Sequence, residues 1–324
     1  MGIRVRQPGL LTTVQDAGRF GEYAIGMPPS GAMDMFSYQV GNYLVGNEDD
    51  AAGLEMTYLG PELEFSENAV IAITGAEMPP KINGEEALTW EVIAVEAGDV
   101  LSFDYLKSGA RSYLAVAGGI DVPIFMHSRS TYTLIGLGGL EGRALREGDE
   151  LVVGEGGDRS ERVGMAVDED YVPAYSKETE LRVIIGLASY RLTEESMEEF
   201  LNATWTVTPD ADRVGYRYKG GELKFVEREQ PAGAGADPAN VVDFGYPIGS
   251  IQVPGGVEPI VLMNDAVTGG GYATIGTIIS ADRDRLAQTK TNDNTRFRSV
   301  DLDEALEARE ERRQQMMQIQ QALS

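Results

Sequence analysis

The segment Thr12–Asp34 combines glycines with side chains that can bind an anion or accept a proton. It runs into a turn at Pro28-Pro29 and then into a helix start, where backbone amides attract anions. An arginine in such a loop can hold a carboxylate or phosphate through two parallel hydrogen bonds. The spacing predicts either an anion-binding site or a capped turn with a structural Asp–Arg pair. The candidate residues are Gln15, Asp16, Arg19, Ser30 and Asp34.

A second candidate segment, Leu114–Thr131, contains the glycine pair Gly118 and Gly119, followed by Arg129 in a polar turn. Because glycine has no side chain, a ligand or another chain segment can approach the backbone closely there. The single histidine, His127, lies in the same turn. A histidine base needs an orienting partner, and the spacing shows none, so we expect a structural or solvated histidine.

A third segment, Asp212–Tyr216, places Arg213 among acidic residues. One interpretation is a clamp for a substrate carboxylate. The alternative is an ion pair with Asp210 or Asp212 at the surface, which would contribute little stability.

A fourth segment, Ile251–Ile275, reads as an apolar strand that ends at Asn264-Asp265. Thr268, three glycines and Tyr272 follow. The pattern predicts a glycine-lined pocket wall, or else a turn that strand geometry requires. It is neither a Walker A loop nor a dinucleotide fingerprint, because it lacks Gly-Lys-Ser/Thr and no suitable helix follows.

The composition removes several catalytic classes. The chain of 324 residues has no cysteine and one histidine. A thiolate zinc site, a cysteine nucleophile and a two-histidine metal site are therefore excluded. There is also no Gly-x-Ser-x-Gly nucleophile elbow. We expect no resident metal site in this chain.

The charge is strongly negative, with 52 acidic against 27 basic residues and a net charge of −25. Such a surface repels phosphodiester backbones and anionic lipids, so nucleic acid is an unfavourable general partner. An acidic, lysine-poor chain also suits a cytosol of high salt, where ions screen self-repulsion. No apolar run reaches the length of a membrane span, and the first residues lack a secretory h-region. We therefore expect a soluble, cytoplasmic protein without membrane contacts.

Glycine accounts for 39 of the residues and is scattered among short β-branched and aromatic runs, which predicts many strands and tight turns. Asn83-Gly84 is a hairpin signal. The predicted strands of the first half are Val70–Thr74, Val92–Val95, Val100–Asp104 and Arg111–Ala117. Those of the second half are Leu181–Gly186, Trp205–Thr208, Leu223–Val226, Ile248–Val253 and Pro259–Met263.

Few helices are expected. Met33–Val45 has one apolar face and a stop at Gly46, and Thr193 can cap a short helix. Asp301–Leu323 opens with an aspartate-led capping box. The polar stretch 154–180 predicts a domain boundary, and 229–239 predicts a loop. The expected divisions are an N-terminal β-rich domain (1–165), a C-terminal β-barrel domain (180–300) and a terminal helix (301–324).

Taken together, these segments resemble the biotin-dependent carboxyltransferase, or allophanate hydrolase subunit 2, family. The resemblance extends over roughly residues 3–310. It departs from the family pattern at Thr268–Ala273, where TTGGYP is usual, and at His127, where glycine is usual. The matching pieces are VQDAGRFGEYAIGMPPSGAMD, LVGN, LE, RSYLAVAGGIDVP, SRST, GGLEGRALREGD, DRVGYR, IQVP and Asp303–Arg309.

The resemblance implies a mainly β fold of two barrel-like, cyclophilin-type halves with a few helices. It implies the C subunit of an ATP-dependent 5-oxoprolinase, which opens 5-oxoproline to glutamate together with a KipI-like subunit and a YcsF-like subunit. ATP with Mg²⁺ would act in that complex, and we expect no activity of the chain alone. The alternatives are a carboxyltransferase component that uses biotin carried on another protein, and a non-enzymatic KipA-like regulator that binds a KipI-type partner.

The resemblance also assigns roles to the candidate residues. Asp16, Arg19 and Asp265 would be catalytic, with Asp16 or Asp265 acting as a base or holding Mg²⁺. Arg129 or Arg213 would clamp a substrate carboxylate. The predicted substrate-binding set is Gln15, Ser30, Asp34, Gly118, Gly119, Arg129, Arg213, Tyr216, Gln252, Gly269, Gly270 and Tyr272.

Overall fold

The computed structural model describes residues 2–156, 159–230 and 232–324, and they fall into two compact units. The first unit comprises Met1–Arg19, Ser30–Tyr175 and Arg313–Ser324, and the second comprises Phe20–Pro29 and Ser176–Arg312. Two segments depart from the predicted ranges. Residues 20–29 belong to the second unit, and the terminal helix contributes to both. Residues 157–158 of the predicted boundary and residue 231 of the predicted loop lie outside the described residues.

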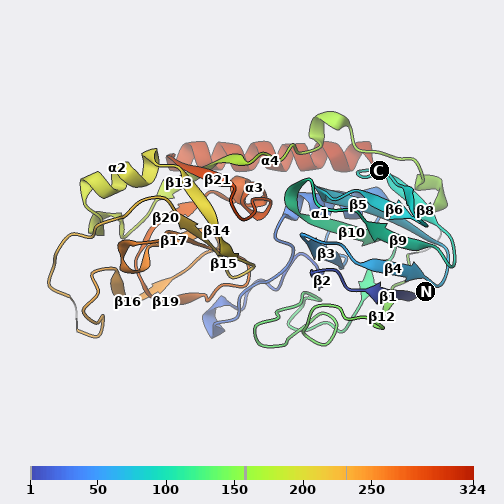
Figure 1. Cartoon of the computed structure of the whole chain (residues 1–324), viewed down its shortest axis with the longest axis horizontal. Coiled ribbons are helices and arrows are strands. Elements are labelled where there is room, and N and C mark those ends of the chain that lie inside the picture. Colours follow the sequence, from blue (N-terminus) through green and yellow to red (C-terminus); the bar gives the residue numbers. More distant parts are fainter. Residues whose placement is uncertain (1, 157–158, 231) are drawn as a thin grey trace. The chain divides into compact units, whose positions relative to one another are not determined.

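The first unit contains two antiparallel sheets (Figure 1). The seven-stranded sheet has the order β11 (Ile120–Asp121), β12 (Glu150–Val153), β1 (Gly2–Gln7), β4 (Glu62–Phe65), β9 (Val100–Phe103), β6 (Pro80–Ile82) and β7 (Glu85–Glu86). The five-stranded sheet has the order β2 (Leu11–Gln15), β3 (Gly53–Thr57), β10 (Ser108–Val116), β5 (Ala69–Glu77) and β8 (Val92–Val95).

Strand β5 shows how the sequence buries both faces of the five-stranded sheet. Side chains alternate between the two faces of a strand. Ile71 and Ile73 join the core shared by the two sheets, whereas Val70 and Ala72 pack with helix α1 (Met35–Val45). The near-continuous apolar run of β5 follows from this double burial.

Helix α1 begins and ends where its capping residues require. The Asp34 carboxylate accepts the amide N–H of Ser37 at 3.0 Å and so caps the N-terminus. Gly46 takes a left-handed conformation (φ 72°), which glycine adopts at little cost, and ends the helix. The stop predicted at Gly46 is confirmed.

The second unit contains a closed seven-stranded barrel (Figure 1). Its order is β13 (Glu178–Ile185), β20 (Thr274–Ile278), β17 (Ser250–Gln252), β18 (Ile260–Leu262), β15 (Gly215–Lys219), β14 (Trp205–Ala211) and β21 (Asn294–Ser299). A separate ribbon pairs β16 (Asn240–Gly245) with β19 (Gly269–Tyr272). Aromatic rings fill part of the unit's interior, where Phe200 stacks on Phe297 at 4.7 Å and Tyr218 meets Phe297 edge-on.

The remaining elements are helical. Helix α4 (Leu302–Ala322) supplies Ala305 and Ala308 to the second unit, and its Ile319 and the following Leu323 belong to a buried apolar cluster of the first. No helix among the described residues is both long enough and apolar enough to cross a membrane. These elements are α2 (Glu194–Asn202), α3 (Arg283–Ala287), α4 (Leu302–Ala322), η1 (Tyr23–Ile25), η2 (Ser160–Arg162), η3 (Glu169–Tyr171), η4 (Ser189–Arg191), η5 (Pro254–Gly256) and η6 (Ser280–Asp282).

The predicted mainly β class is confirmed, with the closed barrel in the second unit and two open sheets in the first. The caps predicted at Thr193 and Asp301 are confirmed, since each side chain accepts a helix amide. The predicted strand Leu223–Val226 is wrong. Its backbone is paired with turn segments, and only Phe225 forms an isolated bridge, with Leu192.

Candidate functional site

The carboxylate of Asp16 joins the first two candidate segments. It follows strand β2 and is buried. It accepts four hydrogen bonds, from the amides of Gly18 (2.8 Å) and Arg129 and from the hydroxyls of Ser128 (2.7 Å) and Ser130. Three of these donors share Oδ1, and the Arg129 amide donates to Oδ2. Asp16 therefore fixes the loop 128–130 against the end of β2, which is a structural task.

Gln15 and Arg19 flank this carboxylate. The amide of Gln15 donates to the Thr13 hydroxyl (3.0 Å) and the Thr131 carbonyl (3.2 Å). The guanidinium of Arg19 donates to the Ser130 carbonyl and lies 6.0 Å from the centre of the Phe125 ring. Both side chains are buried, so the structure places them in the support of the loop.

Ser30 and Asp34 lie in the turn that leads into α1. Ser30 has a left-handed backbone (φ 54°), and a side chain on the next residue, Gly31, would come within 2.8 Å of the Gly18 backbone. The turn therefore packs backbone against backbone. Asp34 uses both carboxylate oxygens on Ser37, through its amide and its hydroxyl (2.6 Å). The predicted capped turn is present.

A buried polar cluster lies under the start of α1 and is not among the sites predicted from the sequence. Glu55 accepts the Tyr113 hydroxyl and the Met33 amide, both at 2.8 Å, and lies 3.7 Å from Arg111. The Tyr113 hydroxyl in turn accepts the Asp34 amide at 2.8 Å. Burial and the charge of Glu55 raise the pKa of Tyr113 well above its usual value. The available signal was a glutamate between the apolar residues Leu54 and Met56 of strand β3.

The glycine pair of the second segment lies where another segment of the same chain packs closely against the backbone. A side chain at Gly118 would lie 2.3 Å from the Gly154 carbonyl, and the φ of Gly118 is 94°. Arg129 donates to the Val122 carbonyl (3.1 Å) and pairs with Asp121 (3.3 Å). The predicted ligand approach at Gly118 is thus occupied by the backbone at Gly154.

His127 is an exposed turn residue. The backbone of Phe125 and Ser128 closes a two-residue turn, and the central residues Met126 and His127 have φ values of 48° and 62°. Glycine adopts this conformation most easily, which explains why glycine suits position 127.

In the second unit, the third and fourth segments meet in an ion pair. Arg213 donates to Asp265 through two nitrogens, at 2.8 and 3.2 Å, and both side chains are buried. The Asp265 amide also donates to the Arg213 carbonyl at 2.9 Å. The predicted surface pair of Arg213 with Asp210 or Asp212 is wrong, because the buried guanidinium pairs with Asp265.

Tyr216 and Gln252 lie in barrel strands. Tyr216 is fully buried in β15, and its hydroxyl donates to the Ala287 carbonyl at 3.3 Å. Gln252 ends β17 and is buried, and burial also raises the pKa of Tyr246.

The ribbon of β16 and β19 carries the most accessible candidate residues. Gly269 and Gly270 pair with Gly245 and Phe244, and Tyr272 is 42% exposed. The Tyr246 hydroxyl accepts the Tyr272 amide (2.7 Å) and donates to the Tyr272 carbonyl (2.8 Å). This two-sided contact fixes the end of β19 and leaves the Tyr272 phenol accessible.

The base of the ribbon meets part of the first segment. The Thr268 hydroxyl donates to the Tyr23 carbonyl of η1 at 3.3 Å. Burial raises the pKa of Tyr23 and lowers that of nearby Arg283.

The first and second segments therefore meet around Asp16 in the first unit, and the third and fourth segments meet at the Arg213–Asp265 pair in the second. The family model of the carboxyltransferase domain, subdomain A and B, matches residues 25–299. The chain belongs to this carboxyltransferase family.

Relatives of this carboxyltransferase-family chain match it over nearly its full length. It is 36% identical over 318 residues to the C subunit of 5-oxoprolinase from Escherichia coli, a match that covers 98% of this chain and 97% of that protein. The corresponding subunit of Haemophilus influenzae is 31% identical, over 92% and 91% of the two chains. The crystal structure of the Kluyveromyces lactis urea amidolyase superposes with a TM-score of 0.92 at 31% identity, over 98% of this chain. The match covers only 20% of that longer chain.

Two carboxylates of this carboxyltransferase-family chain, Asp16 and Asp265, are the predicted candidates to hold Mg²⁺, and both engage donors of the chain itself. Asp16 is engaged by four donors and Asp265 by a guanidinium. No group of three or more metal-binding side chains occurs among the residues that the structure describes.

Proposed function

We propose that this chain is the C subunit of an ATP-dependent 5-oxoprolinase, which opens 5-oxoproline to glutamate together with a KipI-like subunit and a YcsF-like subunit. The observation that carries the proposal is the 36% identity to the Escherichia coli protein, extending over 97% of its length. The Escherichia coli subunit matches this chain over nearly the full length of both proteins. The urea amidolyase matches it over only 20% of a longer chain, so the oxoprolinase subunit is the better parallel.

The β16–β19 ribbon is the part of this chain that we assign to substrate contact. Its phenol at Tyr272 is accessible, and β19 pairs on one side only, with β16. Backbone amides and a phenol are suitable donors to an amide oxygen that gains negative charge during ring opening. The buried candidates Asp16 and Asp265 would then preserve the architecture that presents this surface.

ATP and Mg²⁺ fit better elsewhere in the assembly. The two carboxylates considered for Mg²⁺ already engage donors of this chain, Asp16 through hydrogen bonds and Asp265 through the Arg213 guanidinium. MgATP would supply phosphoryl activation of the lactam oxygen. We therefore assign the nucleotide to one of the other two subunits, and expect no ATP hydrolysis by this chain alone.

Reconstitution of the three subunits tests the proposal. Each is assayed alone and in combination for ADP and glutamate release, with and without 5-oxoproline, in molar KCl. We expect glutamate only when all three are present. A stable complex of active partner preparations that releases no glutamate would contradict the proposal.

A paired substitution tests the ribbon assignment. Tyr272→Ala should lower kcat/KM of the assembled enzyme by about tenfold, equivalent to the loss of one hydrogen bond in the transition state. Tyr105→Ala is the matched control, because Tyr105 is 86% exposed and lies in the first unit. Equal activity of the two variants would remove Tyr272 from the substrate site.

Carboxyl transfer is a second candidate, favoured by the TM-score of 0.92 with the urea amidolyase over 98% of this chain. In that case the carboxyl donor would be biotin held on a separate protein. Incubation with the partner proteins, urea and carboxybiotin should then consume carboxybiotin. The oxoprolinase proposal expects no such consumption.

A further inference from the structure

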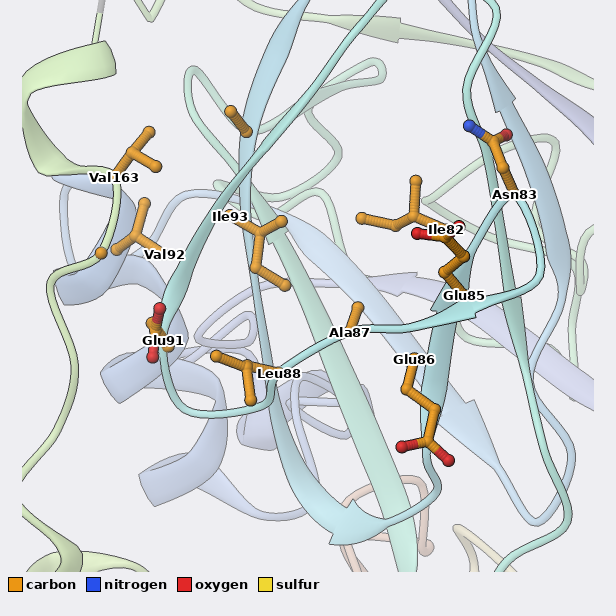
Figure 2. A pocket seen from close by; sticks show the side chains of 12 residues that line it. Ile82, Asn83, Glu85, Glu86, Ala87, Leu88, Glu91, Val92, Ile93 and Val163 are labelled. Atoms are coloured by element: carbon orange, nitrogen blue, oxygen red, sulfur yellow. The ribbon is translucent and has the colours of Figure 1, made fainter.

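A groove of about 620 Å³ opens at one end of the two sheets of the first unit. It lies where β7 ends the seven-stranded sheet and β8 ends the five-stranded sheet. Figure 2 shows the side chains of Ile82 and Ile93 on opposite walls, with Ala87 and Leu88 on the segment that joins β7 to β8. All lining residues belong to the first unit.

The lining of the groove is apolar and accessible. Ile82 and Ile93 pack against the core between the sheets, so the two walls are anchored. Leu88 is 60% exposed and Val163 is 43% exposed. Leu88 and Val163 therefore give the groove an accessible apolar surface.

The rim of the groove is acidic. Three glutamates line it, Glu85, Glu86 and Glu91, and no lining residue is basic. In Figure 2 the carboxylates of Glu86 and Glu91 lie on either side of Leu88. Complementary charge governs which partner approaches such a surface and how fast, so the occupant should be basic.

The edge strand β8 offers a place for an extended backbone. Val92 is already paired with the segment 164–165, through the amide of Gly164 and the carbonyl of Met165. Because backbone groups alternate along a strand, Ala94 presents its N–H and C=O in the same outward direction as Val92. Ala94 is exposed. An added segment could therefore continue the line of residues 164–165 along the edge.

We propose that this groove docks an extended segment of another subunit of the assembly, in which lysine or arginine flanks one large apolar side chain. The apolar side chain lies between Leu88, Ile93 and Val163, and the basic groups meet the glutamates. The inference rests on the proposed function, because the occupant is one of the enzyme's subunits.

Assembly of the full chain with the KipI-like and YcsF-like subunits, followed by sedimentation velocity, tests the proposal. Leu88→Asp should weaken assembly about tenfold or more, as for an anchor residue of an interface. Glu85→Lys combined with Glu86→Lys should weaken it about tenfold and abolish its dependence on salt. The matched controls Leu10→Asp and Glu147→Lys change exposed residues of the same unit away from the groove lining and should alter binding less than about twofold.

A crosslinking experiment identifies the occupant directly. The chain has no cysteine, so Ala94→Cys carries a single benzophenone label, and Glu147→Cys is the control position. Light should crosslink the Ala94 position to a peptide of the KipI-like or the YcsF-like subunit that contains a basic residue beside an apolar one. A crosslink to an acidic peptide, or to none, overturns the proposal.

The outcomes separate the two claims. If the wild-type chain assembles and the groove variants assemble equally well, the docking proposal is wrong and the proposed function stands. If the wild-type chain assembles with neither of the other two subunits, the proposed function fails and the docking proposal fails with it.

Discussion

Each unit buries an aspartate that lies shortly after a strand, and the two units neutralise that charge differently. In the first unit, Asp16 is surrounded by neutral donors, two backbone amides and two serine hydroxyls. In the second unit, Asp265 is matched by the guanidinium of Arg213. Removal of Asp16 would leave several donors without an acceptor, whereas removal of Asp265 would leave a buried cation without its carboxylate.

The largest expected effect is on the Arg213–Asp265 pair. Asp265→Ala should destabilise the second unit by about 3–5 kcal/mol, because a buried charge loses its partner. Arg213→Met combined with Asp265→Leu should recover most of this loss, since no charge then remains buried. The chain has two tryptophans, Trp90 in the first unit and Trp205 in the second.

Fluorine NMR of 5-fluorotryptophan protein during urea unfolding therefore reports each unit separately. The Trp205 signal should respond to Asp265→Ala, and the Trp90 signal is the internal control. The free energy of unfolding lost by the Arg213→Met, Asp265→Leu double variant is compared with the sum of the losses of its two single variants. If the two values are equal, the two residues do not act as a pair.

Asp16 should behave differently under the same measurement. Asp16→Asn should destabilise the first unit by about 2–3 kcal/mol, because the amide nitrogen cannot accept the bond from the Arg129 N–H. Ser128→Ala with Ser130→Ala should not rescue it, because the backbone donors of Gly18 and Arg129 remain. Rescue by the serine substitutions would show that the hydroxyls, rather than the amides, dominate the interaction.

Local features of both constellations were readable from the sequence, and their long-range partners were not. The helix from Met35 to Val45 follows from its periodicity and caps, and the turn at Asn83-Gly84 follows from two residues that tolerate positive φ. In contrast, Asp16 finds its serine donors more than 100 residues away and Arg213 finds Asp265 52 residues away. Such pairs depend on how strands and loops meet, for which a single sequence carries no periodic signal.

The glycines of the two units provide a further contrast. Gly118→Ala should destabilise the first unit by at least about 2 kcal/mol, because its φ is positive and a side chain would meet the Gly154 carbonyl at 2.3 Å. Gly270→Ala in β19 should cost less than about 1 kcal/mol, since φ is ordinary there and the nearest atom is on the Tyr246 ring at 3.1 Å. Urea unfolding of both variants checks this. A large loss for Gly270→Ala would mean that the ribbon is as constrained as the Gly118 turn.

The smallest expected effect is that of removing the partly exposed Arg143–Asp149 ion pair, which contrasts with the buried Arg213–Asp265 pair. Asp149 binds Arg143 through two contacts, at 2.7 and 3.0 Å, and this guanidinium lowers the pKa of Asp149 below 3.8. A folded-state pKa below the unfolded value means that the pair stabilises the protein above about pH 4, and that this contribution is lost as the pH falls through the folded pKa. Asp149→Asn should therefore cost about 1 kcal/mol or less near neutral pH and progressively less in acid.

The salt dependence of stability tests the same difference between the two ion pairs. Molar KCl should shrink the effect of Asp149→Asn, because ions screen a partly exposed pair, but should leave the loss in Asp265→Ala almost unchanged. The measurement is the difference in unfolding free energy between each variant and wild type, at several pH values and two salt concentrations, with Glu147→Gln as the exposed control. An equal salt dependence for the two aspartates would mean that the Arg213–Asp265 pair is reached by solvent ions, and the contrast between a buried and a screened pair would then fail.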